Sequence, residues 1–225
     1  FQAKREYFVF KLWMWERLFT DFSIFLAGFG MTLVVSLLAL VLTLLISLAG
    51  GLVRCSHARV GKSILWLYMS LFQNTPLVVQ IFFFYYVLPR MGVVLSPFSV
   101  GCLGLALYTG AFGIAVVEAS ILAIPKQQSE AAMSQGFSYL QTMSHVIIPQ
   151  AMKIALPSLT NQAVNLIKNS SVLAMIAGGD LMYRTDSWAS ETAVYGPTFL
   201  ITGLLYLSIC LPLSRLVKTL ESKVR

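Results

Sequence analysis

The sequence predicts an all-α membrane protein, and two properties of the chain support this. Of its 225 residues, 57% are hydrophobic and 11% are charged, whereas a soluble domain has roughly 25% charged residues. Apolar stretches of about 20 residues recur along the chain, and a helix of roughly that length crosses about 30 Å of hydrocarbon. These stretches predict five transmembrane helices, at residues 22–50, 64–88, 98–121, 153–177 and 196–216.

The two ends of the chain differ from the spans in composition. Residues 1–21 mix charged and aromatic side chains, and Trp13 and Trp15 suit the headgroup region of a membrane. We expect this segment to form an amphipathic helix that lies on the membrane surface. Residues 22–217 then form a single five-span domain, and residues 218–225 form a basic tail.

The first predicted span carries a stripe of small residues at helical spacing. The stripe consists of Thr32, Ser36, Ala39, Thr43 and Ser47. Small residues on one face allow two helices to approach closely in lipid. The stripe therefore predicts close packing against another helix rather than a ligand site.

The second predicted span contains a proline and several amides. Pro76 frees a backbone carbonyl inside the span, and nearby side chains or a water-lined path must satisfy that carbonyl. Asn74, Thr75 and Gln80 lie next to it. These three residues are candidates for the lining of a pathway through the membrane.

The third and fourth spans add further polar candidates. Glu118 is the only acidic residue that falls inside a predicted span, and the polar residues of the fourth span share one helical face. They are Asn161, Asn165, Lys168 and Asn169. A lysine near the bilayer centre costs about 2.5–3.5 kcal/mol on insertion scales, so it should face protein or water. Two interpretations remain open: a structural lysine that snorkels or pairs with a carboxylate, and a pathway lining that meets an anionic solute group.

A polar stretch at residues 130–149 interrupts the hydrophobic blocks. Ser129 or Gln128 can cap a short helix whose first turn contains Glu130, and Gly136 can end that helix. A second short helix is expected at residues 139–146, running into Pro149. The stretch predicts two short helices at an angle, outside the lipid.

This stretch resembles the cytoplasmic EAA loop of ABC importer permeases. The family pattern is Glu-Ala-Ala, three residues, Gly, nine residues, Ile, any residue and Leu-Pro. The matching residues are Glu130, Ala131, Ala132, Gly136 and Pro149, with Val146 and Ile148 in place of Ile and Leu. The resemblance implies the fold of a type I ABC importer permease. It also implies that the loop, at about 124–150, docks into a cleft on an ATPase subunit.

Two further segments resemble permeases for polar amino acids. FQNTPLVVQ is similar to an FRGTPLLVQ-like segment, and NLIKNSS is similar to an LLKDTS-like segment where family members bind or pass their solute. This second resemblance adds Ser170 to the candidate pathway. Asn169 replaces the usual Asp, which favours an acidic or neutral solute. Glu118 departs from the family pattern, which usually has Arg at that position.

The distribution of basic residues predicts the orientation. One side carries nine of them: Arg54, Arg59, Lys62, Lys126, Lys153, Arg215, Lys218, Lys223 and Arg225. The other side carries six: Lys4, Arg5, Lys11, Arg17, Arg90 and Arg184. By the positive-inside rule, the richer side is cytoplasmic. The N-terminus is therefore expected outside, and the EAA loop and the C-terminus inside.

The resemblance implies one subunit of an ATP-driven importer in the bacterial inner membrane. The expected solute is a polar amino acid such as glutamate, aspartate or glutamine, moved by alternating access. The expected partners are two cytoplasmic ATPase subunits, a second permease, an extracytoplasmic amino-acid-binding protein and the lipid bilayer. ATP and Mg are expected on the ATPase. No cofactor, metal site, catalytic residue or nucleic-acid partner is expected for this chain, so it is not predicted to be an enzyme.

An ion-coupled secondary transporter or channel subunit is the alternative. Such proteins mark their ion path with intramembrane carboxylates, and Glu118 is the single candidate here. Five spans without an inverted repeat also fit that class poorly. An intramembrane enzyme would need a nucleophile–base pair or a set of metal ligands in the spans, whereas His57 and His145 both fall in loops.

Overall fold

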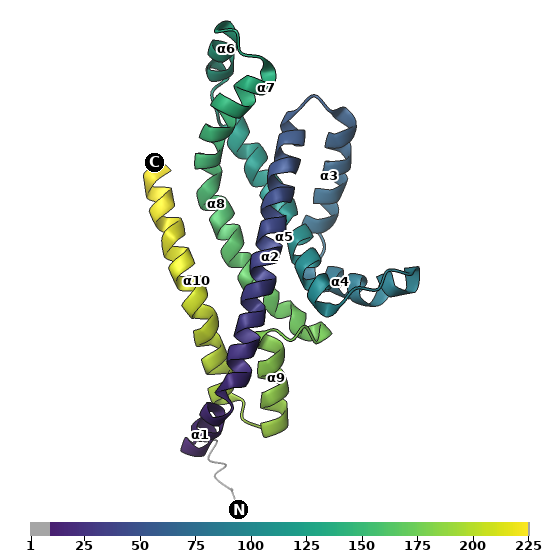
Figure 1. Ribbon diagram of the computed structural model, residues 1–225, viewed down its shortest axis with the longest axis vertical. Coiled ribbons are helices and arrows are strands. Elements are labelled where there is room, and N and C mark those ends of the chain that lie inside the picture. Colours follow the sequence, from purple (N-terminus) through teal and green to yellow (C-terminus); the bar gives the residue numbers. More distant parts are fainter. Residues whose placement is uncertain (1–9, 225) are drawn as a thin grey trace, which may run out of the picture.

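The structure is a computed structural model that describes residues 10–224, and the regular structure in that range is helical (Figure 1). The elements are α1 (Leu12–Thr20), α2 (Phe22–Cys55), α3 (Arg59–Gln73), α4 (Leu77–Phe82), η1 (Phe83–Val87), η2 (Leu88–Met91), α5 (Pro97–Leu122), α6 (Lys126–Ser134), α7 (Tyr139–Thr142), η3 (Met143–Ile147), α8 (Ile148–Asn169), η4 (Ser170–Ile176), α9 (Leu181–Thr192) and α10 (Gly196–Val224). Elements η1 and η3 are π-helical, and η2 and η4 are 3-10 helices.

Three of the described helices are long and apolar enough to cross a membrane: α2, α5 and residues 196–222 of α10. The bent pair α3–α4 could form a fourth span. Helix α8 corresponds to the predicted span at 153–177 but is more polar, because its exposed face carries Asn161 and Lys168. Polar residues on a membrane helix belong where it faces protein or water.

The contact between α2 and α5 is the most extensive in the described chain. All five small residues of the predicted stripe on α2 are buried, which confirms the packing prediction. Gly113 of α5 lies against Ser47, so a Cβ atom on Gly113 would overlap the serine hydroxyl. Gly50 lies against Ile114 in the same way. Small residues therefore bring these two backbones together.

The predicted span at 64–88 is not one continuous helix but a bent pair. Helix α3 and the segment Leu77–Met91, which comprises α4, η1 and η2, meet at 105°. This segment runs sideways from the bundle (Figure 1). The cause is local, because Pro76 has no N–H and restricts the residue before it to extended conformations. Pro76 itself has φ −61° and ψ 137°, which is outside the helical region.

The segment 178–195, which lies between the fourth and fifth predicted spans, contains helix α9. Asp180 begins it as a buried N-cap and accepts a hydrogen bond from the Met182 N–H at 3.0 Å. Trp188 is buried and donates to Asp21 at 2.9 Å, which ties α9 to the junction of α1 and α2. The preceding helix also ends earlier than predicted, at Asn169, and continues as η4.

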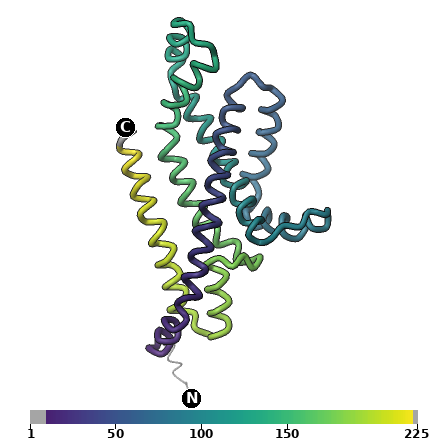
Figure 2. Tube along the Cα trace, in the orientation of Figure 1, coloured from purple at the N-terminus to yellow at the C-terminus, as the bar shows by residue number. Residues whose placement is uncertain are grey.

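The ends of the elements fall into two groups (Figure 2). The α2–α3 turn and the α6–α7 loop lie at one end of the molecule, and the C-terminal end of α10 runs toward the same end. Helices α1 and α9 lie at the opposite end. The charge distribution predicts the same grouping. The first nine residues of the predicted interfacial segment lie outside the described range, whereas Leu12–Thr20 of that segment is helical.

Candidate functional site

Helix α6 presents the Glu-Ala-Ala sequence. It begins at Lys126, directly after Pro125, so the predicted cap at Gln128 or Ser129 is wrong. The fixed φ of proline suits the start of a helix, and the Ser129 hydroxyl instead donates to the Lys126 carbonyl at 2.8 Å. Glu130 and Ala131 are exposed and Ala132 is buried.

Gly136 ends α6 as the sequence predicts. Its φ is +89°, and its N–H donates to the Met133 carbonyl at 2.9 Å. The Phe137 N–H donates to the Ala132 carbonyl at 3.2 Å, which completes a Schellman motif. A Cβ atom at Gly136 would meet nothing within 4 Å. Backbone conformation, rather than crowding, therefore requires glycine here.

The second helix of the loop begins with a capping box. The Ser138 side chain accepts from the Gln141 N–H, and the Gln141 side chain accepts from the Ser138 N–H at 2.9 Å. The helical path then continues through η3 into α8. Pro149 lies in the first turn of α8, where a missing N–H is tolerated. The helix predicted at 139–146 therefore continues into α8, and the loop is joined directly to α8.

The root of this loop is buried against the ends of α2 and α5. One cluster of buried residues joins α5, η3 and α8: Val117, Ile121, Ile147, Ala151, Ala155 and Leu159. Next to it, residues of α2 and of the loop line an apolar pocket of about 300 Å³. A displacement of the loop would therefore reach both α2 and α5.

The polar face predicted for the fourth span lines an open pocket. Asn165, Lys168 and Asn169 of α8 lie around a volume of about 450 Å³, with Tyr108 and Phe112 of α5. Asn161, one turn away, is exposed. Lys168 forms no ion pair with a carboxylate in the range 10–224. The cation therefore faces open space on the polar side of the helix.

Two further pockets lie along α8, one beside α5 and one beside the residues that follow α5. Ala115 and Ala119 of α5 with Ile154 and Ser158 of α8 surround about 420 Å³. A pocket of about 610 Å³ then lies beside Lys153, at the root of the loop. We call this row of three pockets the α5–α8 groove. Its three pockets lie beside Lys168, beside Ser158 and beside Lys153.

Ser170 and the polar residues of the second span lie apart from this groove. Ser170 is buried and donates to the Ile167 carbonyl at 2.7 Å. Gln80 is also buried, and its amide donates to the carbonyls of Phe72 and Thr75 at 3.0 and 3.2 Å. The Phe72 carbonyl is the group that loses its helical donor at Pro76, so Gln80 replaces that donor.

The side chains of Asn74 and Thr75 also bond to backbone carbonyls of α3. Their side chains donate to the carbonyls of Ser70 and Leu71, each at 2.8 Å. The structure therefore brings Asn74, Thr75 and Gln80 together at the bend, where they satisfy the broken end of α3. Their role in a solute pathway stays a prediction.

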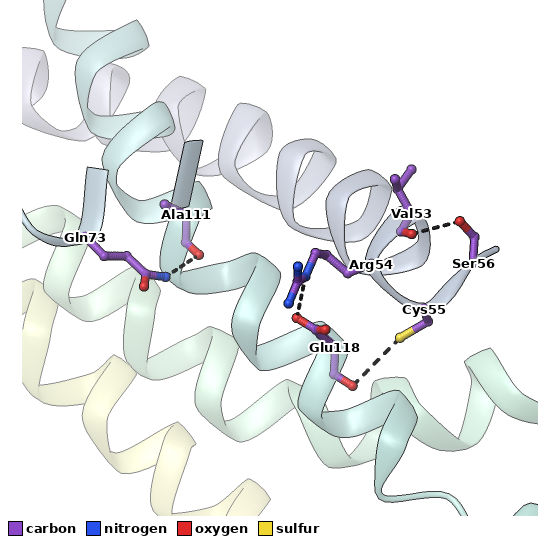
Figure 3. A network of polar contacts seen from close by, with 7 residues as sticks. All are labelled: Val53, Arg54, Cys55, Ser56, Gln73, Ala111 and Glu118. Atoms are coloured by element: carbon purple, nitrogen blue, oxygen red, sulfur yellow. Dashed lines mark hydrogen bonds and ion pairs between the residues drawn. The ribbon is translucent and has the colours of Figure 1, made fainter. Parts of the chain in front are cut away.

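Glu118 is paired with a residue that the sequence did not suggest. Its Oε2 atom accepts from Nε of Arg54 at 2.9 Å, between α5 and the last turn of α2 (Figure 3). In the same region, Gln73 of α3 donates to the Ala111 carbonyl of α5 at 2.8 Å. The residues of the ion pair are 64 positions apart, so sequence spacing gave no signal for it.

These features together define a class of protein. Close-packed helices, a polar groove and an exposed two-helix loop joined to both groove helices are the parts of an ABC importer permease. The family described as binding-protein-dependent transport system inner membrane component matches residues 43–225. The chain belongs to this family.

Individual relatives agree with the family assignment. The chain is 40% identical over 210 residues to the probable glutamine ABC transporter permease protein GlnM of Bacillus subtilis, covering 92% of this chain and 96% of that protein. It is 31% identical to the arginine transport system permease protein ArtQ of the same organism, covering 89% and 92%. These matches confirm the resemblance and favour an ABC permease over the gradient-driven alternative.

A solved structure confirms the predicted type I permease fold. It is an amino acid ABC transporter with histidines, which superimposes with a TM-score of 0.84 at 30% sequence identity. The match covers 92% of this chain and 97% of the solved chain.

Proposed function

We propose that this chain is the membrane-spanning subunit of an importer that moves an acidic or neutral polar amino acid into a bacterial cell by alternating access. The observation that carries this proposal is the pocket of the α5–α8 groove that contains Lys168. A cation without a carboxylate partner in the described chain, flanked by two asparagines, suits the carboxylate of an amino acid. The relatives with glutamine and arginine in their names support an amino acid as the solute class.

Charge decides between acidic and basic solutes in this proposal. The α-carboxylate is common to all amino acids, so Lys168 alone does not discriminate among them. The discrimination rests on Asn169, which lines the same pocket and adds no negative charge. A basic side chain would find no acidic partner among the described residues of this pocket. The aromatic residues Tyr108 and Phe112 supply the opposite wall.

Coupling would take place at the exposed α6–α7 loop. Glu130 and Ala131 are available to a partner, and the loop continues into α8 without a break. Two ATPase subunits that carry ATP and Mg would dock here, so no catalysis is assigned to this chain. A second permease would close the open side of the α5–α8 groove, and an extracytoplasmic binding protein would deliver the solute.

Uptake by the full assembly tests the solute assignment. In proteoliposomes with the wild-type binding protein and ATPase, Lys168→Met should reduce glutamate transport roughly tenfold or more, because it removes a charge-assisted contact. Asn169→Asp should shift uptake toward arginine and lysine. Lys218→Met, an exposed cation on α10 outside the groove, is the matched control. Full transport by Lys168→Met would leave this lysine with a structural role only.

Cysteine labelling tests the proposed orientation. Single cysteines at Ser134, Ser187 and Ser222 should be made after the native Cys55, Cys102 and Cys210 are replaced by serine. In intact cells, a membrane-impermeant thiol reagent should label Ser187→Cys on α9 and should not reach Ser134→Cys on α6 or Ser222→Cys on α10. Labelling of Ser134→Cys from outside would overturn both the orientation and the coupling role.

A further inference from the structure

Glu118, which pairs with Arg54, lies where the helix dipole of α5 disfavours an acidic side chain. Glu118 lies four residues before the end of α5, and a carboxylate near a helix C-terminus is opposed by the helix dipole. Arg54 lies in the last turn of α2, where a cation is favoured. The 2.9 Å contact therefore accounts for an otherwise unfavourable acid.

The pair is partly shielded from solvent. The two side chains are 24% and 20% exposed, so the ion pair is neither a screened surface contact nor a fully desolvated one. Beside it, the Cys55 Sγ atom lies 4.0 Å from the Glu118 carbonyl (Figure 3). A Cβ atom on Gly51, one turn earlier in α2, would overlap the Val117 side chain. The last turns of α2 and α5 are thus held together by both packing and charge.

This joint lies directly beneath the coupling loop. Leu52 and Val53, the neighbours of Arg54, line the apolar pocket of about 300 Å³ together with Tyr139 and Leu140 of α7. Helix α5 is separated from α6 by only the three residues 123–125. A displacement of the loop is therefore transmitted to α5 through the backbone of residues 123–125 and to α2 through side-chain packing.

We infer that Arg54 and Glu118 are positioning residues for transport, an inference that rests on the proposed importer function. The pair keeps the cytoplasmic end of α2 registered with α5 when the loop is displaced. Helices α2 and α5 then move together as a rigid pair, and the α5–α8 groove opens between this pair and α8. Neither residue touches the solute in this assignment. Glu118 was a candidate for the pathway from the sequence, and its pairing with Arg54 gives it this different role.

The experiment measures solute transported per ATP hydrolysed, in proteoliposomes that contain the complete importer and its binding protein. The variants are Arg54→Gln, Glu118→Gln, the double neutral variant, and the swap Arg54→Glu with Glu118→Arg. Each single variant leaves one partly buried charge unpaired and weakens the joint between α2 and α5. We expect roughly tenfold less solute transported per ATP hydrolysed. Arg59→Gln, an exposed cation at the start of α3, is the matched control and should keep the wild-type ratio.

The swap is the decisive variant. It restores opposite charges between the same two positions. We therefore expect it to recover most of the solute transported per ATP hydrolysed. The double neutral variant removes the unpaired charge and should lie between the single variants and wild type. A swap as impaired as the singles would overturn the pairing and would point to separate roles of the two residues. Single variants with the wild-type ratio would overturn the positioning role altogether.

Two controls separate this inference from the proposed function and from simple misfolding. If the wild-type importer shows no solute-stimulated ATP hydrolysis, the proposed importer function itself is overturned, independently of the variants. Yield and thermal stability of each purified variant report on folding. A structural defect would lower transport and ATP hydrolysis in step with the folded fraction and leave their ratio unchanged, and that result would also overturn the inference.

Discussion

Helix α5 has two faces that meet their neighbours in different ways. Toward α2 it offers glycines, and Gly113 lies against Ser47 of the small-residue stripe on α2, whose members are all buried. Toward α8 it offers Tyr108, Phe112, Ala115 and Ala119, which line pockets of about 450 and 420 Å³. One face is packed to contact. The other face packs against α8 through Val117 and Ile121 and borders open volume at the four residues just named.

This difference shows how a small membrane subunit can be both rigid and open. In lipid, helices associate through van der Waals packing and hydrogen bonds rather than through the hydrophobic effect. Close packing on the α2 face therefore supplies the association energy for the pair. The α8 face can then leave volume unfilled around Ala115 and Ala119, while the buried cluster with Val117 and Ile121 holds α5 and α8 together near the loop. The predictions below test this division, beginning with the change that should disturb the molecule most.

The packed face should not tolerate a single added methyl group at its tightest point. We expect Gly113→Ala to cost about 1–3 kcal/mol of stability by overpacking, because its Cβ atom would lie 2.8 Å from the Cβ of Ser47 and overlap the hydroxyl. The measurement is the thermal stability and folded yield of the purified subunit. Ser47→Gly removes both atoms, so the double variant should regain most of the loss.

A glycine on the outer surface provides the control for that substitution. Gly203 of α10 has nothing within 4 Å of its would-be Cβ, so Gly203→Ala should be neutral or slightly stabilising in a helix. Equal losses for Gly113→Ala and Gly203→Ala would show that the α2–α5 contact is not specially tight.

The open face should respond in the opposite way. Ala119→Leu fills part of the 420 Å³ pocket of the groove from an exposed position, so folding should survive while uptake falls several-fold. The same substitution at Ala49, exposed on α2, should leave uptake unchanged. Uptake by reconstituted assemblies, divided by the folded amount, is the measurement. Undiminished uptake by the Ala119→Leu variant would show that this pocket is not part of the transport path.

The packed face was predictable from the sequence, and much of the open face was not. Small residues at helical spacing on α2 signal a close helix contact wherever they occur, although they do not name the partner helix. The polar face of α8 was also predicted, because its polar residues recur at helical spacing. The aromatic wall was not predicted, because Tyr108 and Phe112 are ordinary apolar positions in a span until α8 is placed beside them.

Two other differences arose from local chemistry that the hydrophobic pattern conceals. The 105° bend between α3 and α4 lies inside an apolar stretch, so composition predicted a single span across it. Pro76 was noticed, but the signal for a full break was the set of side chains that replace the lost hydrogen bonds, above all Gln80. Helix α9 was not predicted, because its charged residues exclude it from the apolar spans, although the buried cap Asp180 marks its start.

A second glycine completes the comparison, because it is required for a different reason from Gly113. Gly136 has open space around it but a φ of +89°, where an L-residue costs about 1–2 kcal/mol. Gly136→Val should therefore distort only the α6–α7 turn and leave the α2–α5 contact intact. Membrane insertion and thermal stability should stay near wild type, while solute-stimulated ATP hydrolysis and transport fall. Asn tolerates the left-handed region better than Val does, so Gly136→Asn should retain more of both activities. If Gly136→Val keeps full solute-stimulated ATP hydrolysis, the loop does not couple this subunit to an ATPase through that turn.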